Sequence, residues 1–142
     1  AMTRFNMGLI VPLPLPYELY QSDFETEDSL AEFRELVGKA KLYFELPMRF
    51  GTLGDLARRG SGQSNKLRDQ QYALVGAYLV ERCDELIAVY DEKGSAGVGG
   101  TGDVVGWRLA GKVPDIYSTR SDFFSRPVLT RPMVLNPDKL PA

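Results

Sequence analysis

Short apolar runs and amphipathic segments follow one another along the chain and predict alternating strands and helices. Residues 8–13, 41–46 and 85–90 are short apolar stretches, which are typical of strands buried in a parallel sheet. Proline stops the first two runs, because it cannot donate to a strand's hydrogen-bond ladder. Residues 29–37 and 66–83 carry apolar side chains at helical spacing and predict two helices.

The first of these helices has recognisable signals at both of its ends. Residues 23–26 offer side chains that could cap it, and Ser29 and Glu32 stand three residues apart and could form a capping box. Gly38 predicts the helix end. Its apolar positions are Leu30, Phe33, Leu36 and Val37. The longer helix presents one apolar stripe, formed by Tyr72, Val75, Leu79 and Val80. We expect Tyr72 and Tyr78 to take part in packing and interfaces rather than in stacking on a base.

Residues 51–65 predict a mobile loop, because they hold four glycines and mixed charge. A basic cluster lies in and beside this loop, formed by Arg58, Arg59, Lys66 and Arg68. Such a cluster could close over a phosphate as a lid. A charge run is more often a solvated surface, and we favour that interpretation.

The last third of the chain begins with a glycine-rich loop at residues 91–100. A helix is predicted over Thr101–Ala110, and Gly111 ends it. Residues 113–131 are aromatic and irregular, and residues 132–136 predict a last short strand. We expect the tail, residues 113–142, to wrap the domain or a second copy of it.

This order of elements predicts the fold class. Strands that alternate with helices pair in parallel, with helices on both faces of the sheet. We therefore expect residues 1–142 to form a single α/β domain, a Rossmann-like three-layer sandwich with a small, mainly parallel sheet of about four strands. A small sheet leaves apolar surface uncovered, which predicts a homo-oligomer.

Composition narrows the class of partner and the location. The 142 residues include 17 basic and 19 acidic side chains, a net charge of −2, which disfavours direct nucleic-acid binding. The apolar runs are too short to span a bilayer, so we expect no membrane association. No leader pattern is visible, and the single cysteine, Cys83, cannot form an internal disulfide. We expect a cytoplasmic protein.

The absence of histidine from the sequence limits the chemistry. It excludes Ser-His-Asp and Cys-His catalysis and most zinc sites, because one cysteine without histidine cannot build a tetrahedral site of nitrogen and sulfur ligands. We expect no metal and no cofactor. Any reaction must rest on carboxylates, hydroxyls, Lys, Arg and backbone amides.

The glycine-rich loop predicts a site for an anion. It follows a strand, precedes a helix and would lie at the carboxyl edge of the sheet, where such folds bind ligands. We expect a phosphate to bind at Gly99, Gly100, Thr101 and Gly102, because glycines admit a close approach and a helix start favours negative charge. The alternative is a flexible turn in which Thr101 only caps its helix. The spacing matches neither the ATPase phosphate loop nor the usual dinucleotide motif.

Two carboxylates, Asp91 and Asp103, flank this loop. As a pair they could cleave an N-glycosidic bond, one stabilising positive charge on the sugar and the other activating water. In the alternative interpretation, Asp91 accepts amides of its own loop and Asp103 complements the helix dipole. The sequence leaves both open.

The segment Val98-Gly-Gly-Thr-Gly-Asp103, with Arg82-Cys83-Asp84 ahead of its strand, resembles the Rossmann-like SLOG superfamily. That group includes cytokinin-activating phosphoribohydrolases of the lysine-decarboxylase-like type, the DNA-processing protein DprA and nucleotide sensors. The resemblance implies binding of a nucleotide or a nucleotide-derived ligand, with phosphate on the Gly99–Thr101 turn. The phosphoribohydrolases carry Pro-Gly-Gly-x-Gly-Thr-x-x-Glu, so here the Thr and Gly are reversed and the acid is displaced. Members of the group also open with an additional strand that this chain does not show before Leu9.

Overall fold

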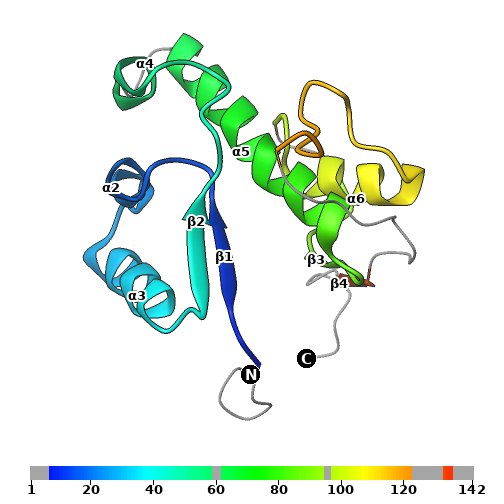
Figure 1. Cartoon of the computed structure of the whole chain (residues 1–142), viewed down its shortest axis with the longest axis horizontal. Helices are drawn as coiled ribbons and strands as arrows, with labels where there is room; N and C mark the ends of the chain where they lie inside the picture. Colours follow the sequence, from blue (N-terminus) through cyan, green and yellow to red (C-terminus); the bar gives the residue numbers. More distant parts are fainter. Residues whose placement is uncertain (1–6, 59–61, 95–96, 123–132, 136–142) are drawn as a thin grey trace. The chain divides into compact units, whose positions relative to one another are not determined.

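The computed structural model describes residues 7–58, 62–94, 97–122 and 133–135, and it divides the chain into two compact units (Figure 1). The first unit, Ala1–Arg49, contains β1 (Ile10–Leu13), α2 (Tyr17–Tyr20), the 3₁₀ helix η1 (Gln21–Asp23), α3 (Glu27–Gly38) and β2 (Leu42–Glu45). The second unit, Phe50–Ala142, contains α4 (Leu53–Ala57), α5 (Gly62–Arg82), β3 (Ile87–Val89), α6 (Thr101–Ala110) and β4 (Met133–Leu135). The prediction of a single domain over residues 1–142 stays a prediction.

The strands pair in parallel, which confirms the α/β class. β1 pairs with β2 and places Ile10 opposite Leu42, and β3 pairs with β4 and places Ile87 opposite Met133. Helix α3 lies between the first two strands in the chain and α6 between the last two, as a parallel connection requires. The described strands thus form two sheets of two strands, where the sequence predicts one sheet of about four.

The core of the first unit is aromatic. Phe33 of α3 is buried with Leu13 and Val37, and Phe24 stacks on its ring with centroids 4.6 Å apart. Tyr20 meets the same ring edge-on at 5.3 Å. Burial raises the pKa of the Tyr20 hydroxyl, and Asp23 raises it further. The short helices α2 and η1, which the sequence did not predict, bring Tyr20 and the residues beside it to this core.

The prediction of a capping box at Ser29 and Glu32 is wrong by one turn. Thr26 is the N-cap of α3, and its side chain accepts the Ser29 amide at 3.1 Å. The Ser29 hydroxyl in turn accepts the Thr26 amide at 3.4 Å. Because this pair already satisfies both orphan donors, the helix begins at Glu27.

The loop predicted at residues 51–65 holds a helix and the start of another. A capping box starts α4: Asp55 Oδ2 accepts the Thr52 amide at 2.9 Å, and Thr52 Oγ1 accepts the Asp55 amide at 3.2 Å. Arg68 is buried and donates to the Leu56 carbonyl, so it joins α5 to α4, and the favoured prediction of a solvated surface is wrong for this residue. Arg58 and Lys66 are exposed, as that prediction expects. Arg59, another member of the predicted cluster, lies outside the described residues.

Helix α5 is buried over more of its circumference than one stripe. Leu79 is 37% exposed, which corrects its predicted core position, while Ala73, Leu74, Ala77 and Val80 are buried. Gly76 allows α6 to approach closely, since a Cβ there would overlap Cγ2 of Val104. The predicted apolar stripe is wrong at Leu79, because the buried face of α5 also depends on where small residues such as Gly76 let α6 pack closely.

Residues 113–122 pack against α5 and α6. The Tyr117 ring stacks on that of Trp107 with the ring centroids 5.7 Å apart, and its centroid lies 5.6 Å from that of Phe50. Thr119 is fully buried and donates its hydroxyl to Glu81 at 2.7 Å. Residues 123–132 and 136–142 of the predicted tail lie outside the described residues.

The prediction that the strands are wholly buried is wrong for β3. Ala88 is buried, whereas Ile87 and Val89 are 60% and 58% exposed, because α6 covers one face of the strand. In the first unit Ile10 and Leu42 are also exposed. Within the described part of the chain, no helix is long and apolar enough to cross a membrane.

Candidate functional site

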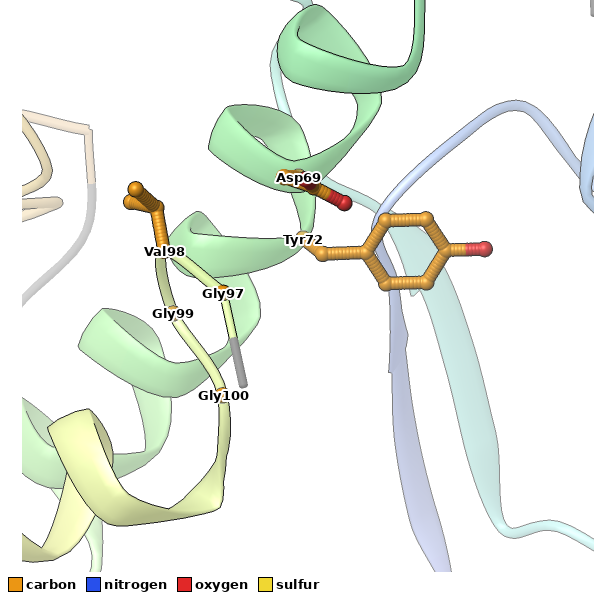
Figure 2. A pocket seen from close by; sticks show the side chains of 6 residues that line it. All are labelled: Asp69, Tyr72, Gly97, Val98, Gly99 and Gly100. Carbon is orange, nitrogen blue, oxygen red and sulfur yellow. The ribbon is translucent and has the colours of Figure 1, made fainter. Parts of the chain in front are cut away.

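A pocket of about 370 Å³ lies in the second unit, between α5 and the loop that precedes α6 (Figure 2). Asp69 and Tyr72 line it from α5. The other wall is the loop segment, residues 97–100, formed by Gly97, Val98, Gly99 and Gly100. In Figure 2 the Asp69 and Tyr72 side chains extend to the same side of α5, away from Val98.

Gly99 has a packing reason to be glycine. Its φ is +76°, a left-handed conformation that side chains rarely adopt. A Cβ there would overlap Cα and Cβ of Ala73 and lie 2.9 Å from the Ala73 nitrogen. The loop therefore packs directly on the backbone of α5 at one of the residues that line the pocket.

Two of the four residues predicted to hold a phosphate already use their amides inside the loop. The Gly99 N–H donates to Asp103 Oδ2 at 2.9 Å, and the Gly100 N–H donates to the Gly97 carbonyl at 3.1 Å. Asp103 thus serves as an internal anion for this turn. Asp103 also lies in the first turn of α6, where its charge complements the helix dipole, as the structural alternative expects, but its bond to a loop amide was not predicted.

The other two residues, Thr101 and Gly102, lie in the first turn of α6. The amides of a first helical turn have no acceptor within the helix. Gly100 is the N-cap of α6 and supplies no side-chain acceptor, whereas Thr26 and Thr52 cap α3 and α4. The positive end of α6 therefore lies next to the glycine wall of the pocket.

Asp91 bonds within its own turn. Its Oδ1 accepts the Lys93 amide at 3.1 Å, and its Oδ2 lies 3.3 Å from Lys93 Nζ. The bonds from the Lys93 amide and side chain lower the pKa of Asp91, so the carboxylate stays ionised at neutral pH. Glu92 takes a φ of +63° to complete this turn.

The structure does not bring the predicted carboxylate pair into the pocket. Asp91 and Asp103 each bond within a local turn, and the carboxylate among the residues lining the pocket is that of Asp69. The sequence pattern indicated no role for Asp69 and predicted packing for Tyr72. The available signal was their spacing, since residues three apart share one helix face.

Cys83 is partly buried beside the Arg108 guanidinium. Burial raises the pKa of its thiol, an effect that the nearby Arg108 opposes. Arg108 is itself buried, and its guanidinium lies 3.6 Å from the sulfur. Among the residues that the structure describes, no group of three or more Cys, Asp or Glu side chains could hold a metal ion.

Comparison with protein-family models, with curated proteins and with solved structures finds no match to this chain. The resemblance to the SLOG superfamily therefore stays a hypothesis that rests on the residues around the glycine loop. Function has to be argued from the pocket itself.

Proposed function

We propose that this protein binds a nucleotide or a nucleotide-derived ligand in the pocket between α5 and the glycine loop. The observation that carries the proposal is the placement of a pocket of about 370 Å³ where a glycine wall, a helix start and an aromatic ring meet. This volume is at the lower end of the range of small-molecule sites. It fits a mononucleotide better than a dinucleotide.

The anionic part of the ligand would bind at the start of α6. The amides of Gly99 and Gly100 are engaged, so Thr101 and Gly102 would be the donors. A phosphate there would satisfy first-turn amides and interact favourably with the helix dipole. The Thr101 hydroxyl could add a further donor.

The base would lie against Tyr72. This ring is half-buried on α5 and lines the pocket. A tyrosine face can stack on any base, which supports an affinity for nucleotides without deciding which base is preferred. The proposal gives Tyr72 a role that the helical pattern did not indicate.

The proposal extends to the type of α/β fold, the oligomeric state and the cellular location. We place the chain in a Rossmann-like three-layer sandwich of the SLOG type, supported by the two parallel strand pairs and the strand, glycine loop and helix order. The exposed Ile87 and Val89 support a homo-oligomer that covers them. Cys83 as the single cysteine supports a cytoplasmic location.

Cleavage of an N-glycosidic bond by Asp91 and Asp103 has less support. Such a reaction needs two carboxylates that face the scissile bond from opposite sides. Asp91 is bonded to Lys93, and Asp103 to the Gly99 amide. We therefore propose binding or sensing as the function.

A pocket-filling variant tests the proposal. Gly97 has no positive φ, and a Cβ there would lie 3.8 Å from Asp69 Oδ2, so Gly97→Leu directs a side chain into the pocket without backbone strain. Gly106→Leu is the matched control, since Gly106 is exposed on α6 and a Cβ there would meet no heavy atom within 4 Å. Nucleoside monophosphates, cyclic nucleotides and inorganic phosphate are titrated against the wild type and both variants by calorimetry.

We expect at least one nucleotide to bind to the wild type and to Gly106→Leu, and Gly97→Leu to lose that binding. A ligand at a hundred times its dissociation constant would also stabilise the wild type by about 2.7 kcal/mol in a thermal unfolding experiment. The proposal is wrong if no nucleotide binds, or if Gly97→Leu binds as the wild type does while remaining folded.

A further inference from the structure

Asp69 lines the pocket, and binding of a phosphate at the start of α6 gives its carboxylate no role. We propose that its carboxylate accepts hydrogen bonds from the ribose hydroxyls of a mononucleoside ligand, so that the site selects ribonucleotides over deoxyribonucleotides. This inference rests on the proposed function and adds the specificity of the site.

The first observation is that Asp69 has no partner in the described part of the chain: it forms no hydrogen bond or ion pair there. Three other acidic residues of the second unit bond within the chain. Asp55 bonds to Thr52, Glu81 to Thr119, and Asp103 to Gly99. Asp69 therefore keeps its acceptors available to a molecule in the pocket.

The second observation is the position of the carboxylate relative to the opposite wall. Asp69 Oδ2 lies 3.8 Å from the point where a Cβ of Gly97 would be, so the carboxylate is close to the glycine wall of the pocket. Tyr72 lies one turn further along α5 and extends to the same side (Figure 2). A group that stacks on Tyr72 is therefore within one helical turn of the Asp69 carboxylate.

The chemistry of a carboxylate decides which part of the ligand can lie beside it. An ionised carboxylate only accepts hydrogen bonds, so its neighbour must be a donor. A phosphate would be repelled as a like charge, which leaves the anionic end of the ligand at the start of α6. Two adjacent ribose hydroxyls match the two oxygens of one carboxylate, and removal of the 2′-hydroxyl leaves one of them without a donor.

The experiment compares ribose and deoxyribose ligands. The affinities of the four ribonucleoside 5′-monophosphates and of their 2′-deoxy counterparts are measured by calorimetry with the full chain. The variants are Asp69→Asn and Asp69→Ala, and Asp115→Asn is the control, since Asp115 is exposed and does not line the pocket. Circular dichroism of each variant shows that it is folded.

We expect the wild type and Asp115→Asn to prefer a ribonucleotide by about 10-fold to 100-fold, the range of one hydrogen bond to a charged group. In Asp69→Ala the ratio should fall close to one. Equal affinity of the wild type for ribose and deoxyribose ligands would overturn the role of Asp69 and leave the proposed function standing. An unchanged ratio in folded Asp69→Ala would do the same, whereas a wild type that binds none of the eight compounds overturns both proposals.

Discussion

Gly99 lies directly on the backbone of Ala73, so close that a Cβ at Gly99 would overlap two carbon atoms of that residue. This contact holds the loop before α6 against the middle of α5, and Gly99 also lines the pocket between them. The glycine is needed twice, for its φ of +76° and for the absence of a side chain. The packing of the loop and the existence of the site are therefore coupled.

Gly99→Ala is expected to destabilise the second unit by about 2 to 4 kcal/mol, from overpacking together with a left-handed alanine. Urea unfolding followed by the fluorescence of Trp107 measures this, because the single tryptophan lies in α6. Gly106→Ala is the control and should stabilise the helix by up to about 1 kcal/mol. If Gly99→Ala is as stable as the wild type, the loop does not pack on α5 in solution.

Gly76 of α5 and Val104 of α6 lie in close contact, and substitutions at these two positions should be strongly coupled. Gly76→Ala alone is expected to lower stability, because its Cβ would overlap Cγ2 of Val104. Adding Val104→Ala removes that methyl, and the double variant should recover about 0.5 to 3 kcal/mol relative to the sum of the single changes. Additive effects in the same urea measurement would contradict this packing.

Signals that lie close together in the sequence predicted the elements well. Helix Thr101–Ala110 is confirmed at both ends, because Gly100 precedes it and Gly111 takes the left-handed conformation, φ +68°, that ends a helix. Strands predicted at residues 85–90 and 132–136 are confirmed as β3 and β4. These features depend on local backbone chemistry.

Features that depend on contacts between distant segments could not be predicted. The buried face of α5 is decided by Gly76 against Val104 and by Gly99 against Ala73, which no periodicity encodes. Likewise Asp69 becomes a pocket residue only because a loop much later in the chain, residues 97–100, lies beside it. Residues 23–26 and Ser29 both offered cap side chains in the sequence, and only the structure shows that Thr26, bonded to Ser29, is the N-cap.

Glu81 should make the stability of the second unit depend on pH. Burial raises the pKa of this carboxyl, but hydrogen bonds from Ser118 and Thr119 and the charge of Arg82 outweigh it and leave the pKa below its usual value. Because the pKa is lower in the folded state, this stabilisation is complete above the unfolded pKa and is lost as pH falls through the folded one.

Glu81→Gln is therefore expected to lower the stability of the second unit by about 1 to 3 kcal/mol at pH 7, with a smaller loss near pH 3. Urea unfolding at several pH values measures the difference. Glu85→Gln removes an exposed carboxylate between α5 and β3 and serves as the control. A penalty for Glu81→Gln that is the same at both pH values would show that the charge of Glu81 is not what Thr119 binds.

Arg108 of α6 binds the carbonyl groups at the C-terminal end of α5, so replacing it should lower the free energy of unfolding. The guanidinium is buried and donates to the carbonyls of Val80, Cys83 and Asp84, which lie in or just after the last turn of α5 and lack helical donors. Arg108→Met keeps the apolar stem but leaves these acceptors unpaired, so we expect a loss of about 3 kcal/mol or more. Arg108→Lys keeps the charge without the planar guanidinium, and its stability should lie between that of the wild type and that of Arg108→Met. The control is Lys112→Met at an exposed position, which should change the stability little. Equal stability of Arg108→Met and wild type in the urea experiment would mean that water or the chain itself satisfies the end of α5, and that Arg108 is not the group that closes it.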